Sequence, residues 1–216
     1  MALPEPLPPA YDAVVLAGGR SSRLGGVPKA ELVLGENSLL EITLDAAAGA
    51  REIAVAGPDR LESMLLRHGD NCVRVREDPP FAGPAAAVGA ALTVLDQRSA
   101  ARGRPAPEWI LVLACDMPGV ARAVPALVAE AARDPRTSLM AVDARGKAQP
   151  LAALYRSAEL RRCVAARPEG LENLSMFSLL ARVQWREVAV PAGSTADVDT
   201  WDDAGRWGIS PGNRTA

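Results

Sequence analysis

Apolar residues recur along the chain in two spacings that alternate with each other. Short apolar or alternating runs, typical of buried strands, occupy residues 13–17, 51–56, 72–76, 109–115, 137–142, 151–155 and 184–190. Apolar positions three and four residues apart predict helices over 38–50, 61–67, 84–97, 124–132, 157–166, 176–181 and 201–207. This alternation predicts an α/β fold with a mainly parallel, doubly wound sheet. Ligands are then expected at the carboxyl ends of the strands.

A single domain is expected, because the 216 residues contain no internal repeat and no dividing linker. We predict a disordered, proline-rich leader over residues 1–10, a folded domain over 11–209 and a frayed tail over 210–216. The leader lacks the basic start and apolar core of a signal peptide. No run approaches the roughly 20 apolar residues that span a bilayer. We therefore expect a cytoplasmic protein without a membrane partner.

Charge and reactive side chains exclude several classes of function. The 24 basic and 26 acidic residues give a net charge of −2, which argues against nucleic-acid binding. Cys72, Cys115 and Cys163 are far apart, so they form no zinc motif or redox pair and are expected to be small buried hydrophobes. The only histidine, His68, lies near the end of a predicted helix, and histidine-based catalysis is not expected.

The turn after the first apolar run carries the strongest candidate chemistry. The run ends and the chain turns at Leu16, Ala17, Gly18 and Gly19. A polar loop follows with the cations Arg20, Arg23 and Lys29. Glycine lets backbone N–H groups approach an anion, arginine grips phosphate oxygens in a fork, and lysine acts as a mobile point charge. The loop therefore predicts a polyphosphate cradle, with a glycine-rich turn bearing surface cations as the alternative. Lys29 is expected to face solvent.

This stretch resembles a known family signature. Residues 16–29 are similar to L-A-G-G-x-S-x-R-M-G-x-D-K of the molybdenum cofactor guanylyltransferases, the molybdopterin-guanine dinucleotide biosynthesis protein A type. Leu24 replaces the methionine, and Pro28 replaces the aspartate, as in sugar-phosphate nucleotidyltransferases. The resemblance extends over about residues 12–207 and implies a single-domain, Rossmann-like nucleotidyltransferase fold. It also implies that Arg23 and Lys29 hold the nucleotide phosphates.

A second element follows the third predicted strand. Asp78 is expected to end that strand, and a Pro/Gly loop through Gly83 enters the helix 84–97. By itself this is either an ordinary acidic turn or an edge that contacts a base or ribose. The stretch 77–88 looks like D-x-x-P-x-x-G-P-L-A-G-V of the guanylyltransferases and is nearer to it than to the related cytidylyltransferases. The resemblance implies that Asp78 and Gly83 contact the nucleotide.

Asp116 closes the most apolar predicted strand, directly before Met117 and Pro118. A carboxylate at the carboxyl end of a strand can hold Mg²⁺, which favours oxygen ligands. Capping of a following helix is the alternative. The stretch matches the C-D-M-P motif of the family, which implies that Asp116 is the metal ligand.

Two further motifs complete the resemblance. Gln149 begins a stretch similar to Q-P-L-x-A-L-Y, which implies a place on the acceptor side, although the residues alone indicate an ordinary strand. Asp197 and Asp199 alternate, so both are expected on one side, where they repel unless a cation lies between them. Capping of a helix by Asp199 or Thr200 is the alternative. The family has N-x-N-T or D-x-D-T here, which implies a second metal contact.

Together, these motifs in the family's order imply one reaction. GTP would donate GMP to the terminal phosphate of molybdopterin with Mg²⁺, and pyrophosphate would leave. Proteins that deliver the cofactor would be further partners. Three alternatives stay open: CTP as donor, a sugar phosphate or phospholactate as acceptor, or a nucleotide-binding module without catalysis. Pro28 and Lys29 favour another acceptor, whereas residues 149–155 argue against it.

Overall fold

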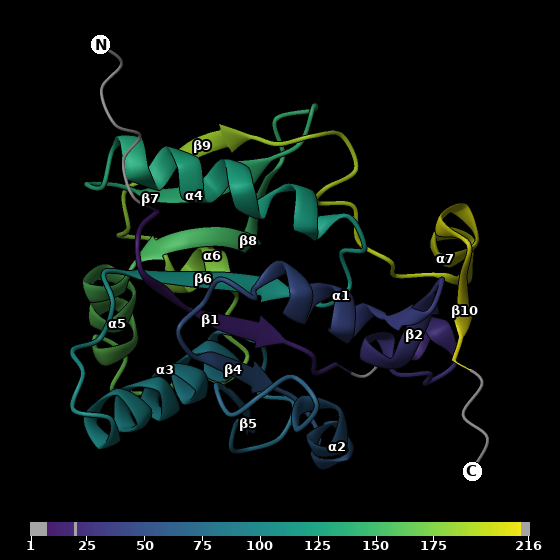
Figure 1. The fold of residues 1–216 in the computed structure, drawn as a ribbon, viewed down its shortest axis with the longest axis horizontal. Coiled ribbons are helices and arrows are strands. Elements are labelled where there is room, and N and C mark those ends of the chain that lie inside the picture. The colour runs from purple at the N-terminus through teal and green to yellow at the C-terminus, as the bar shows by residue number, and fades with distance from the viewer. Residues whose placement is uncertain (1–7, 20, 213–216) are drawn as a thin grey trace.

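A seven-stranded sheet forms the centre of the computed structural model, which describes residues 8–19 and 21–212 (Figure 1). Its strands are β1 (Tyr11–Leu16), β4 (Ile53–Ala56), β5 (Cys72–Val75), β6 (Trp109–Ala114), β7 (Ser138–Val142), β8 (Ala148–Arg156) and β9 (Trp185–Ala189). They follow the order β5–β4–β1–β6–β8–β7–β9. All neighbours are parallel except the two pairs made by β8, which runs antiparallel to β6 and β7. The predicted α/β fold with a mainly parallel sheet is confirmed.

Helices cover both faces of this sheet (Figure 1). One face packs against α1 (Leu39–Ala46), α2 (Glu62–Leu65) and α4 (Val124–Arg133). The other face packs against α3 (Pro84–Ala101), α5 (Ser157–Ala165) and α6 (Met176–Leu179). Side chains of β1 alternate between the two cores, because successive residues of a strand point to opposite faces. None of the described helices combines the length and the apolar character needed to cross a membrane.

Most predicted elements lie within a few residues of the observed ones. Ser38 caps α1 as predicted, because its Oγ accepts a hydrogen bond from the backbone N of Glu41 at 3.2 Å. The helix α3 continues to Ala101, beyond its predicted end at residue 97, and β8 begins at Ala148 rather than at residue 151. The predicted helix 61–67 is a 3₁₀ turn (Asp59–Leu61) followed by one turn of α-helix.

A second, three-stranded sheet was not predicted. It consists of β2 (Leu32–Leu34), β3 (Asn37–Ser38) and β10 (Ile209–Pro211), and it lies beside α7 (Trp201–Trp207) at one end of the molecule (Figure 1). Its apolar side packs with Leu24 and Val198. Since β10 pairs with β2, the predicted fraying from residue 210 is wrong for Ser210 and Pro211. Residues 1–7 of the predicted leader and 213–216 of the tail lie outside the described residues.

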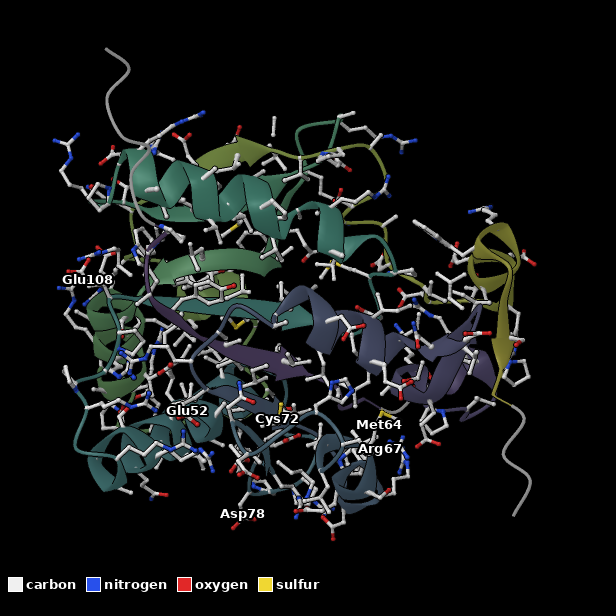
Figure 2. The ribbon with its side chains drawn as sticks, viewed as in Figure 1. Glu52, Met64, Arg67, Cys72, Asp78 and Glu108 are labelled. Carbon is white, nitrogen blue, oxygen red and sulfur yellow. The ribbon has the colours of Figure 1, made fainter. Side chains whose placement is uncertain are left out.

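A buried carboxylate stabilises the end of the sheet that lies opposite the carboxyl ends of the parallel strands. Glu52, which precedes β4, is 0% exposed, and Figure 2 shows it beside α3. Its two carboxylate oxygens lie 2.8 Å from Arg98 Nε and 2.7 Å from Arg102 Nη1 and Arg104 Nη2. A carboxylate this deeply buried needs such partners, because desolvation otherwise makes its charge costly. The three arginines therefore join the start of β4 to the end of α3.

We predict that Glu52→Gln lowers the free energy of unfolding by about 2 kcal/mol, because it leaves three converging arginines without their shared carboxylate. Urea denaturation would measure the change. Glu108→Gln is the matched control, since Glu108 pairs with Arg156 at 2.9 Å but is 71% exposed. The control should cost less than about 0.5 kcal/mol, as exposed pairs do. Equal losses in the two variants would contradict the prediction.

Candidate active site

Three adjoining cavities open above the carboxyl ends of the central strands. Their volumes are about 400, 410 and 290 Å³, and all three are lined by Gly18, Gly19 and Lys29. We call them the first, second and third cavities in that order. The second is also lined by Leu16, Ala56 and Ala114, the last residues of β1, β4 and β6. The cavities therefore occupy the edge of the sheet where the sequence predicted a ligand.

The turn after β1 brings its backbone to the cavities. Ala17 N donates a hydrogen bond to Ala56 O at 2.8 Å, so the first residue after the strand still follows the sheet. Gly18 and Gly19 are exposed, and Gly19 has a φ of +146°, a value that residues with a Cβ rarely adopt. The predicted cradle residues thus lie together. Arg20 lies outside the described residues.

Lys29 stands between two carboxylates that are far from it in the sequence. Its Nζ donates to Asp116 Oδ2 at 2.9 Å and to Asp199 Oδ1. Its side chain is only 20% exposed, so the expectation that Lys29 faces solvent is wrong. The exposed Arg23 adds a weaker contact, with Nη1 3.4 Å from Asp199 Oδ2. The third cavity thus holds two cations and two carboxylates.

The two carboxylates determine the protonation of Lys29. Burial favours loss of its proton and lowers its pKa, whereas the charges and hydrogen bonds of Asp116 and Asp199 raise it. The carboxylates prevail, and the pKa of Lys29 is raised above its ordinary value. The ammonium is therefore charged at neutral pH and fixed between its partners.

A backbone contact places Asp199 opposite Asp116. Val198 is fully buried, and its N donates to Asp116 O at 2.8 Å. Asp116 follows β6 and caps no described helix. Thr200 instead caps α7, since its Oγ1 accepts from Asp203 N at 3.2 Å, and Asp199 stays free to bind Lys29. Asp197 is exposed and lines none of the three cavities.

The loop before α3 presents different residues from those predicted. β5 ends at Val75, so Asp78 does not end that strand; it is exposed, and Figure 2 shows it at the periphery, directed away from the sheet. Its neighbour Glu77 is half-buried and lines the first two cavities, as does Phe81. Sequence reasoning missed both, although Glu77 opens the stretch that carried the resemblance. Gly83, with a φ of +97°, lines the second cavity.

Gln149 lies at the same edge of the sheet because β8 is antiparallel. The start of β8 therefore meets the carboxyl ends of β6 and β7, and Gln149 pairs in register with Ala141. Leu151 reaches the second cavity, whereas Gln149 does not line it. The Oε1 of Gln149 accepts a 3.5 Å hydrogen bond from Leu151 N.

Comparison with known proteins identifies the family of this site. Residues 13–185 match the MobA-like NTP transferase domain, which is well over half of the chain. The chain belongs to this family. The match confirms the predicted resemblance, and it makes this MobA-like chain a member of a family of nucleotidyltransferases.

Individual relatives agree with the family. The MobA-like chain is 31% identical over 150 residues to a molybdenum cofactor guanylyltransferase of Rhodopseudomonas palustris (strain HaA2), covering 68% of this chain and 66% of that protein. A second, from Pseudomonas syringae pv. syringae (strain B728a), is 30% identical over 118 residues, covering 55% of this chain and 53% of the relative. The chain thus matches between about half and two thirds of the length of these curated relatives.

A solved structure extends the likeness to nearly the whole fold. The crystal structure of a homologue of Mycobacterium tuberculosis Rv0371c, from Mycobacterium sp. strain JC1, superimposes with a TM-score of 0.67 at 28% identity. The superposition covers 91% of this MobA-like chain and 93% of the other. The Rossmann-like fold that the resemblance implied is confirmed.

We predict that Lys29→Met lowers the free energy of unfolding by about 1 kcal/mol at pH 7, because it leaves two neighbouring carboxylates without their cation. In the parent protein this contribution should persist below the ordinary lysine pKa and disappear as pH rises through the raised one. Thermal melting at several pH values would measure both effects. The double variant with Asp199→Asn should recover part of the loss; no recovery would contradict the ion-pair explanation.

Proposed function

We propose that this protein transfers GMP from GTP to the terminal phosphate of molybdopterin and releases pyrophosphate. The observation that carries the proposal is the cluster of Lys29, Asp116 and Asp199 beside the glycine turn. The names of the curated relatives support the choice of donor and acceptor. The match leaves about a third of the first relative and nearly half of the second uncovered, so the activity is our inference for this chain.

The reaction needs charge neutralisation rather than a protein nucleophile. An oxygen of the acceptor phosphate forms a bond to the α-phosphorus of GTP, and the bond from that phosphorus to the bridging oxygen of pyrophosphate breaks. Cys115, which lines the second cavity, is buried, and burial raises its pKa, so it is not an attacking group. Catalysis then rests on bringing two anions together and stabilising the leaving pyrophosphate.

The chain's own cations suit that task. Backbone N–H groups around Gly18 and Gly19 can approach phosphate oxygens closely, because neither residue has a Cβ. Arg23 can donate to the phosphates from its exposed position, and the Lys29 ammonium can exchange a carboxylate for a phosphate oxygen. Both would hold the β- and γ-phosphates and balance the charge that develops on pyrophosphate.

Asp116 and Asp199 would hold Mg²⁺. Among residues 8–19 and 21–212, no group of three or more His, Cys, Asp or Glu side chains could hold a metal ion by itself. Two carboxylates that already share a cation fit Mg²⁺, which binds through one or two carboxylates together with substrate phosphates. When bound, Mg²⁺ would supply positive charge to the phosphate oxygens. Asp197, which lies outside the cavities, would at most act from a distance.

Glu77 supports guanine as the base. Guanine carries two adjacent N–H donors on its pairing edge, whereas cytosine carries a single amino donor there beside two acceptors. The carboxylate of Glu77, at the first two cavities, can accept both hydrogen bonds from guanine. A mismatched base would leave polar groups unpaired in the cavity.

A screen of the four nucleoside triphosphates with molybdopterin tests the proposal directly. Dinucleotide product should form fastest from GTP, and pyrophosphate release should require the acceptor. Turnover of CTP at an equal rate would contradict the choice of base. Product with a sugar phosphate or phospholactate, and none with molybdopterin, would identify another acceptor. Nucleotide binding without pyrophosphate release under any of these conditions would identify a binding module.

Asp116→Asn should reduce dinucleotide formation about 100-fold or more, since removal of a group that organises transition-state charge costs roughly 3 kcal/mol. The free energy of unfolding should not rise, because Asp116 forms an ion pair with Lys29. Neutralising Asp116 therefore removes an attraction and relieves no net repulsion. Product formation at varied Mg²⁺ and thermal melting would be measured together. Asp197→Asn serves as the control and should stay near the parent activity. Near-normal activity of the Asp116 variant would contradict the assignment of Asp116 as a metal ligand.

Glu77→Gln should lower the preference for GTP over CTP about tenfold, because the amide replaces one hydrogen-bond acceptor with a donor. The ratio of kcat/KM for the two nucleotides is the measurement. Asp78→Asn is the matched control one residue away, and its ratio should equal that of the parent protein, because Asp78 does not reach the cavities. A shift in the control with none in the Glu77 variant would restore Asp78 as the base contact.

A further inference from the structure

Phe81 is a large apolar side chain in an unfavourable position. The residue is 53% exposed, although burying an aromatic ring normally stabilises a fold. Its backbone has a φ of +64°, in the left-handed region that side chains with a Cβ seldom adopt. A glycine would satisfy that conformation more easily. The fold therefore carries a conformational cost here without the full burial that would offset it.

Neighbouring contacts hold Phe81 in this conformation. Its backbone N donates to Glu77 Oε1 at 3.1 Å, which closes the loop on its N-terminal side. On the other side, Ala82 is buried, and its O accepts from Asn173 N at 2.7 Å. Gly83 then leads into α3, where its O accepts from Ala87 N. The strained residue is fixed at both ends, so the ring is presented from a defined backbone rather than from a loose loop.

Phe81 borders the two cavities that would hold the nucleotide under the proposed function. Phe81 lines both the first and the second cavity, and Gly18, Gly19 and Lys29 line the same two cavities. Among the described residues that line them, it is the only aromatic one. Glycines and prolines form much of the first cavity's wall and leave room for a flat heterocycle. An aromatic ring face and a heterocyclic base attract each other by stacking.

We propose that Phe81 is a stacking platform for the base of the bound nucleotide. This inference rests on the proposed function, because it requires a nucleotide in these cavities. Stacking depends little on which base is bound, since every base has a π-face. Phe81 therefore supplies affinity for the base, while Glu77, at the edge of the same cavities, distinguishes one base from another.

Phe81→Gly separates a binding role from a structural one, because glycine suits a φ of +64° and removes the ring. GTP and CTP should each bind about tenfold more weakly to this variant, by isothermal titration calorimetry. Its Tm should equal or exceed that of the parent protein. Phe81→Ala should bind as weakly but melt no higher than Phe81→Gly, because alanine keeps the Cβ. Phe81→Tyr, which keeps a ring, should restore binding.

Two controls isolate the base contact. Inorganic tripolyphosphate has no base, so its affinity should be the same for the parent protein and for Phe81→Gly. Phe177→Ala removes a ring with the same 53% exposure from α6, outside the three cavities, and it should leave GTP affinity unchanged.

Each remaining outcome overturns the inference. Unchanged GTP affinity with reduced turnover would mean that the ring contacts the acceptor. A lower Tm with weaker tripolyphosphate binding would mean that the ring supports the loop as a whole. If the parent protein binds tripolyphosphate but shows no added affinity for GTP, no base site exists. Failure of the parent protein to bind either ligand would contradict the proposed function itself, which distinguishes that failure from failure of the stacking role.

Discussion

The charge balance around Lys29 is the constraint on which the candidate active site depends. Two carboxylates, Asp116 and Asp199, face each other at the end of β6, and like charges so close repel unless a cation separates them. Lys29 supplies that cation from the loop after β1. Three segments that are distant in the sequence meet at one ammonium group. The charged partners are only partly exposed, so water screens their attraction only in part.

The rest of the fold brings these three segments into reach of one another. The apolar cores on both faces fix the ends of β1 and β6. The backbone bond from Val198 to Asp116 fixes the segment that carries Asp199. The small sheet then pairs β2, which follows Lys29 closely, with β10, which follows α7. Packing and backbone hydrogen bonds therefore determine the distances between the three segments. The charges determine which side chains meet at the centre of the site.

Sequence patterns predicted the elements that have a strong period and missed those that do not. Strand β6 and helix α7 lie within a residue of their predicted bounds, because an unbroken apolar run and a polar cap mark their ends. Strands β2 and β3, of three and two residues, are too short to show any period. The direction of β8 is also absent from its pattern, since a largely buried apolar strand has the same composition in either direction.

The site was predicted in its parts but not in its contacts. Asp116 and the glycine turn were identified because they follow apolar strands, whose ends meet at one edge of a parallel sheet. Lys29 was expected in solvent because its partners lie 87 and 170 residues away, and no local pattern records such distances. Glu77 and Phe81 were missed because the loop after β5 turns Asp78 outward and leaves its neighbour Glu77 half-buried. Which of the two adjacent carboxylates faces inward depends on the backbone geometry of the loop.

The pairing of Lys29 with Asp199 has a consequence for the order in which the protein matures. During synthesis, the glycine turn leaves the ribosome long before Asp199 and β10, and the central strands can pair while those segments are still missing. Until then, Lys29 and Asp116 lack their third partner, and β2 lacks the strand that covers it. A chain can thus have most of its sheet formed and still have no complete site. Contacts this distant in sequence close late because their loop entropy must be overcome first, and so a segment made later completes a motif made much earlier.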